Sequence, residues 1–129
     1  MAITHSVTYT YTWGGTQTRK AVDISADGDD NRIISVPSPS TNLLVALVID
    51  ISQLKAFFMV ADAALTVKTN SSGAPQETFT LVADQPIIWT SVSGVAIPFA
   101  GDVTALYVTQ AGSLSTATLE IHILVDATV

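Results

Sequence analysis

The chain has 129 residues, a length that suits one folded domain with a single hydrophobic core. Hydrophobic residues make up 48% of the chain and charged residues only 12%, a composition that excludes a disordered or coiled-coil protein. Eleven acidic and five basic residues give a net charge of −6, which opposes binding to nucleic acid or to an anionic membrane. We therefore expect neither as a partner.

The sequence contains no cysteine, so it has no disulfide, no zinc-thiolate site and no thiol nucleophile. Its first residues lack the basic region and the apolar stretch of a signal peptide, and the longest apolar run, 43–49, is too short to cross a bilayer. These features predict a protein made in the cytoplasm of its host cell and stabilised by packing alone.

The first predicted element is a β-hairpin. In residues 6–13 apolar and polar side chains alternate, as in a strand with one face in water. The apolar ones are Val7, Tyr9, Tyr11 and Trp13. Gly14 and Gly15 suit a two-residue turn, and residues 16–24 are expected to return as the second strand.

The next segments are predicted from turn residues and apolar runs. Residues 27–31, which include three aspartates, are expected to form a turn before a short strand at 33–36, and two prolines break the chain at 37–40. Residues 42–50 are almost continuously apolar, which predicts a central strand covered on both faces. Residues 51–60 also fit a helical stripe, but the absence of a cap favours a turn near Ser52 followed by a strand.

Short alternating segments complete the prediction. They lie at 65–69, 77–82, 87–89, 103–109 and 116–125, and residues 91–101 are expected to form a long ordered loop. About eight to ten short strands at this spacing predict an all-β fold, an antiparallel β-sandwich resembling a jelly roll. We expect one domain, 1–129, with residues 1–5 as an N-terminal arm.

The aspartate-rich segment partly matches the calcium-loop pattern. Asp23, Ser25, Asp27 and Gly28 match four positions of that pattern, but Ile34 stands where a bidentate glutamate is needed. We therefore expect a solvated turn, with weak calcium binding at Asp23 and Asp27 as the alternative.

No other motif predicts catalysis. Glu120 and His122 share the polar face of the last strand, which is usual for a solvated surface, and a hydrolytic or metal-binding role is the alternative. The sequence has no glycine-rich phosphate loop and no nucleophile elbow. We expect a protein that is not an enzyme and that has no cofactor and no metal.

The aromatic residues are the strongest surface candidates, because tryptophan and tyrosine are enriched at interfaces. Tyr9, Tyr11 and Trp13 lie on one side of the first strand. The favoured interpretation is that this side faces the core. The alternative is a surface for a partner, or, at Trp13 or Trp89, a stacking platform for sugars.

Residues 51–125 resemble the small accessory virion proteins of tailed bacteriophages. The segments that carry the resemblance are 51–55, 65–70, 85–89, 98–109 and 117–124. The resemblance implies a capsid decoration or cement protein: a β-sandwich that assembles as a homotrimer, binds the major capsid protein on the outer surface of an icosahedral shell, and stiffens that shell.

The residue pattern agrees with an associating protein. A mean hydropathy of +0.45 with few charges indicates apolar surface of the kind that marks interfaces. We select Ile3, Trp13 and Phe99 as candidate contacts with another subunit or with the shell, because Ile3 and Phe99 are hard to place in the core of one sandwich. The alternative function is a carbohydrate-binding or adhesion module of a virion fibre, a tail or a secreted protein.

Overall fold

A computed structural model describes residues 2–110 and 115–126. Ten strands lie within these ranges, and no helix does. Their bounds are β1 Ile3–Trp13, β2 Thr16–Ala26, β3 Gly28–Val36, β4 Ser40–Val45, β5 Leu54–Ala61, β6 Leu65–Thr69, β7 Thr78–Leu81, β8 Ile87–Thr90, β9 Leu106–Gln110 and β10 Ala117–Val125.

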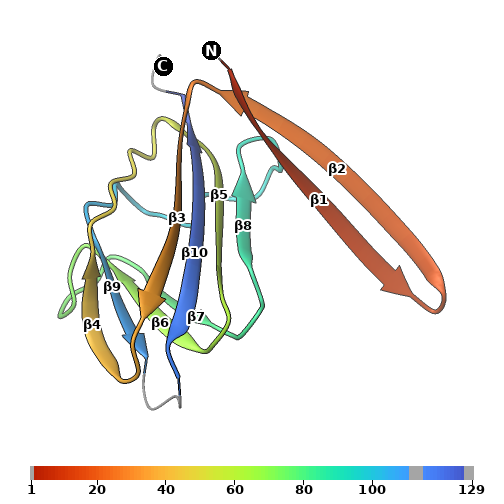
Figure 1. The fold of residues 1–129 in the computed structure, drawn as a ribbon. Helices are drawn as coiled ribbons and strands as arrows, with labels where there is room; N and C mark the ends of the chain where they lie inside the picture. The colour runs from red at the N-terminus through yellow and green to blue at the C-terminus, as the bar shows by residue number, and fades with distance from the viewer. Residues whose placement is uncertain (1, 111–114, 127–129) are drawn as a thin grey trace.

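Eight of these strands form two antiparallel four-stranded sheets packed face to face (Figure 1). One sheet has the order β3-β10-β5-β8 and the other the order β4-β9-β6-β7. Apart from the β6–β7 hairpin, each successive strand from β3 to β10 changes sheet, which gives two interleaved four-stranded sheets of the jelly-roll type. The predicted all-β antiparallel sandwich is therefore confirmed.

The core lies between the two sheets. Because side chains alternate along a strand, every second residue of β6, β9 and β10, and of β5 from Phe57 onward, points into it. The largest fully buried apolar side chains there are Leu47, Ile49, Met59, Leu81, Leu119, Ile121 and Ile123.

The remaining two strands form a separate hairpin that leans away from the sandwich (Figure 1). β1 and β2 pair over their full length, from Ile3↔Ala26 to Trp13↔Thr16. Gly14 and Gly15 have φ of +50° and +84°, the left-handed conformations that a two-residue hairpin turn of this kind requires. The predicted hairpin is confirmed, and we call it the arm.

The expected arm at residues 1–5 is corrected by this arrangement. Ile3, Thr4 and His5 belong to β1 and pair with β2, so the projecting element is the whole hairpin 3–26. Met1 lies outside the described residues. The period-two pattern indicated the strand, but pairing with β2 decided where it begins.

Two other expectations are also corrected. Residues 29–31 are not a turn but part of β3, because pairing with β10 holds this polar segment extended. Residues 42–50 are not a central strand. β4 is an edge strand that pairs only with β9, and Leu44 and Val48 are exposed while Val45 and Leu47 are buried. The apolar run therefore has one face in water.

Candidate functional site

The arm has two chemically different faces, because its residues alternate in direction. One face carries Thr8, Thr10 and Thr12 on β1, with Arg19 and Gln17 opposite them on β2. Near the base of this face, the Ser6 hydroxyl donates to Asp23 Oδ1 at 2.7 Å. Apart from Ala21, which pairs with Thr8, the face is polar, and it lies in water.

The other face of the arm is apolar at its base. Its side chains pack on Ala56 and Leu124, on the outer face of the β3-β10-β5-β8 sheet. The packed side chains are Ile3, Val7, Val22, Ile24 and Ala26. The arm is thus anchored to the sandwich by a small hydrophobic cluster separate from the main core.

The same apolar face continues toward the tip of the arm, where it is no longer covered. Tyr9, Tyr11 and Trp13 are 42%, 72% and 48% exposed. The rings of Tyr11 and Trp13 lie 5.9 Å apart between centroids, tilted by 40°. We call these three residues, together with Lys20 opposite Tyr9, the aromatic face. The expectation that the three aromatic residues face the core is therefore wrong, since the arm leans away from the sandwich (Figure 1).

The candidate interface residues differ in position. Trp13 is exposed at the tip of the arm, whereas Ile3 is half-buried at its base. Phe99 is only 3% exposed and packs edge-to-face on Phe57 and Phe79, at centroid distances of 5.0 and 5.7 Å. Phe99 is thus a core residue, and its selection as a surface contact is corrected. The ordered loop before β9 folds it inward.

Trp89 is not a free stacking platform. Its side chain is half-buried against the core, and its Nε1–H donates to the Val95 carbonyl at 2.9 Å. This bond fixes the indole to the loop that follows β8. Of the two tryptophans, Trp13 is the one that presents an open ring.

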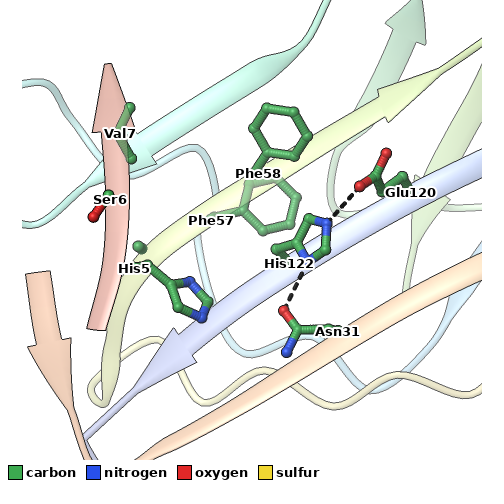
Figure 2. A pocket seen from close by; sticks show the side chains of 9 residues that line it. His5, Ser6, Val7, Asn31, Phe57, Phe58, Glu120 and His122 are labelled. Carbon is green, nitrogen blue, oxygen red and sulfur yellow. Dashed lines mark hydrogen bonds and ion pairs between the residues drawn. The ribbon is translucent and has the colours of Figure 1, made fainter. Parts of the chain in front are cut away.

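A hollow of about 440 Å³ lies where the base of the arm meets the sheet (Figure 2). Its side chains come from the arm and from β3, β5 and β10. They are His5, Ser6, Val7, Asn31, Ala56, Phe57, Phe58, Glu120 and His122. The hollow has a polar side formed by β3 and β10 and an apolar side formed by β5.

A network of hydrogen bonds connects the side chains on the polar side of the hollow. His122 Nε2 lies 2.7 Å from Glu120 Oε1, and His122 Nδ1 lies 2.7 Å from Asn31 Oδ1. The Asn31 amide nitrogen donates to Asp29 Oδ2 at 2.8 Å, and His5 Nε2 lies 3.1 Å from the same oxygen. This hydrogen-bond network thus runs from the arm through β3 to β10.

Both ring nitrogens of His122 take part in this network. Since the Asn31 nitrogen donates to a carboxylate, Asn31 Oδ1 is the acceptor that faces His122 Nδ1. Glu120 places a second acceptor against Nε2. His122 therefore has a hydrogen-bonding oxygen at each of its two ring nitrogens.

The hydrogen bonds of Asp29 lower the pKa of its carboxyl group. The hydrogen bond from Asn31 lowers its pKa most, and the bond from His5 lowers it further, because both stabilise the ionised form. Asp29 is therefore ionised at neutral pH and ties His5 of the arm to β3.

Of the residues that the sequence offered for catalysis or metal binding, Asp23, Ser25, Glu120 and His122 lie on two strands, β2 and β10. Glu120 and His122 share the outer face of β10, as predicted, and contact each other. Asp23 and Ser25 are not in a calcium-type loop but extended on β2, each bonded to a hydroxyl of β1. Within residues 2–110 and 115–126, no group of three or more histidine, cysteine, aspartate or glutamate side chains is placed to hold a metal ion.

The sequence alone did not predict the full hydrogen-bond network. Glu120 and His122 are two positions apart on one strand, and this spacing was enough to predict that their side chains share one face. His5 and Asp29 are 24 positions apart, and Asn31 and His122 are 91 positions apart. No local pattern joins them, because the contacts depend on the sheet order.

The chain has no match among the protein-family models, the curated proteins or the solved structures with which it was compared. In the described part of the chain no helix has the length and apolar character needed to span a membrane.

Proposed function

We propose that this protein is a capsid decoration or cement protein, which binds the outer surface of an icosahedral phage shell and stabilises it. The observation that carries the proposal is the arm, a hairpin that projects exposed Tyr9, Tyr11 and Trp13 away from a small sandwich. Exposed aromatic side chains on a projecting ribbon are costly for a free monomer and useful for assembly.

Other features support a structural role. The jelly roll occurs in capsid proteins, although a fold alone does not assign a function. The chain carries few lysines that would block pairing at sheet edges, and the exposed Leu44 and Val48 lie along the edge strand β4 and the segment after it. Both features favour a protein that is surrounded by neighbours.

The stabilising effect would arise from linkage. A protein that binds only the assembled shell shifts the equilibrium toward that shell, and many copies bound together add their contributions. In this proposal the protein forms homotrimers, the major capsid protein is its partner, and the virion surface is its location. It is neither an enzyme nor a nucleic-acid-binding or membrane protein, and it uses no cofactor.

The test uses empty shells of the parent phage stripped of accessory proteins. The purified protein should have a mass of about 40 kDa by light scattering, three times the 13.5 kDa chain. It should saturate the stripped shells and raise their melting temperature. A protein that does not bind the shells would contradict the proposal.

A second candidate is a carbohydrate-binding or adhesion module, favoured by the exposed Tyr11–Trp13 pair. Adjacent open rings can stack on sugar faces. In the Trp89→Phe variant, Trp13 is the only tryptophan, so a shift of its fluorescence on adding a panel of mono- and oligosaccharides would favour this candidate. No shift with any sugar, together with binding to shells, would favour the decoration role.

A further inference from the structure

The arm covers only one end of the outer face of the β3-β10-β5-β8 sheet. It rests on Ala56 and Leu124. The next positions along β5 and β10, with their paired neighbours on β3 and β8, lie on the same face but remain partly or fully accessible. We call these positions the open sheet face. They are Ile33, Phe58, Val60, Ile88, Glu120 and His122.

The open sheet face has a mixed chemistry. Phe58, Val60 and Ile88 are half-buried, and Ile33 is 74% exposed although it is a large apolar residue. Glu120 lies between Ile33 and Val60 in the sheet register. It also lines a second hollow of about 330 Å³, to which Asp62 and Asp84 contribute. The face is therefore apolar with carboxylates along it.

We propose that the aromatic face of one copy docks on the open sheet face of a second copy of this chain. The proposal rests on the self-association that the proposed function includes, and it does not depend on the shell. It assigns the arm as the donor element of the contact and the outer sheet face as its receptor.

The first support is that the chain already contains this type of packing. The apolar side of the arm ribbon packs on the outer face of the sheet at Ala56 and Leu124. Tyr9, Tyr11 and Trp13 continue that ribbon side, and Phe58 and Val60 continue that sheet side. Since the arm leans away, its tip stays exposed in its own chain, and the equivalent sheet of another copy is a matching surface (Figure 1).

The second support is charge. Residues 8–22, the outer part of the arm, contain Arg19 and Lys20 and no acidic residue. Subtracting their +2 from the net charge of −6 leaves −8 on the rest of the chain. A basic tip on a strongly acidic body attracts another copy of the same body, and it would also orient the approach.

The third support is that charge and apolar surface coincide on both sides. Lys20 pairs with Tyr9, so the cation stands beside the aromatic row. On the receptor side, Glu120 stands between the apolar Ile33 and Val60. An aromatic row with one cation and an apolar strip with one carboxylate are complementary surfaces. The contact joins two different surfaces and is heterologous, so copies related by a rotation that closes form a ring.

The test uses engineered cysteines, because the natural chain has none. Thr18→Cys places a thiol on the aromatic face without removing an aromatic ring, and Ile33→Cys places one on the open sheet face. Gln17→Cys is the matched control, since it is the next residue, is also exposed, and lies on the opposite side of the ribbon. The Ile33→Cys chain is mixed with either the Thr18→Cys chain or the Gln17→Cys chain, without shells and under mild oxidation.

We expect the Thr18→Cys and Ile33→Cys chains to form a mixed disulfide. Its initial yield should be at least about tenfold above the yield from the Gln17→Cys and Ile33→Cys chains, because a specific contact raises the effective thiol concentration to the millimolar range. Equal yields from the two pairs would overturn the proposal. As a second measurement, Tyr11→Ser with Trp13→Ser should reduce the mass found by light scattering to that of the monomer, whereas Thr10→Ser with Thr12→Ser should not.

The outcomes separate this proposal from the proposed function. Equal disulfide yields with normal uptake by stripped shells would reject the arm contact and leave the decoration role standing. A selective disulfide with no uptake by shells would reject the decoration role alone. Trp13 that stays open to iodide in solution and becomes protected only on shells or with sugars would also reject docking on a second copy.

Discussion

His5 Nε2 lies 3.1 Å from Asp29 Oδ2, and this contact ties the arm to the first strand of the sandwich. The same aspartate oxygen accepts a hydrogen bond from Asn31, which in turn contacts His122 on β10. The orientation of the arm therefore depends on a polar contact at its base as well as on the apolar cluster around Ala56 and Leu124.

This contact predicts a pH dependence of stability. Because the folded-state pKa of Asp29 is lowered, ionised Asp29 stabilises the folded state at pH values above the ordinary aspartate pKa near 4. That contribution is lost as the pH falls through the lowered folded pKa. Asp29→Asn should therefore have a lower urea midpoint than the natural chain at pH 6, with the difference shrinking between pH 4 and pH 2. A carboxyl titration of Asp29 by NMR with a midpoint at or above 4 would contradict this.

Phe99 and Trp13 should respond in opposite ways to truncation. Phe99→Ala removes a buried ring that packs on Phe57 and Phe79, and should lower the free energy of unfolding by about 3–5 kcal/mol. Trp13→Ala removes an exposed ring at the tip of the arm and, at protein concentrations where the chain is monomeric, should change that free energy by about 0.5 kcal/mol or less. Urea unfolding of both variants measures the contrast, and similar losses in the two would show that Trp13 is packed.

The turn of the arm should be sensitive to a side chain at Gly15. Its φ of +84° is unfavourable for residues with a Cβ, so Gly15→Val should destabilise the hairpin by about 1–2 kcal/mol. Amide hydrogen exchange in residues 8–21 should accelerate by roughly 5- to 30-fold. Gly73→Ala is the control, because a Cβ there meets open space and needs no left-handed φ. Unchanged exchange in the arm of Gly15→Val would count against the turn geometry.

The two tryptophans should differ in access to a soluble quencher. At protein concentrations where the chain is monomeric, iodide should strongly quench the fluorescence of Trp13 in the Trp89→Phe variant, because that ring is 48% exposed. In the Trp13→Phe variant quenching should be weaker, since Trp89 packs against the core and its indole is bonded to Val95. On assembly, the quenching of Trp13 should fall. Equal quenching of both variants at low protein concentration would contradict the exposed tip.

The sequence determined the elements that depend on local pattern. The alternation from Val7 to Trp13, followed by two glycines, predicted the arm as a hairpin, because strand periodicity and turn geometry are both local properties. The same holds for β6, whose bounds 65–69 were predicted as they are found. The shared face of Glu120 and His122 also follows from alternation on one strand.

Only the tertiary structure decided which faces are buried and which distant residues meet. Alternation placed Tyr9, Tyr11 and Trp13 on one side, but whether that side is covered depends on the direction in which the arm leaves the sandwich. From the sequence, Phe99 was hard to place in the core of one sandwich, yet its loop places the ring against Phe57 and Phe79. The contacts of His5 with Asp29 and of Asn31 with His122 arise from sheet order and from the position of the arm, which are set by the packing of the whole chain.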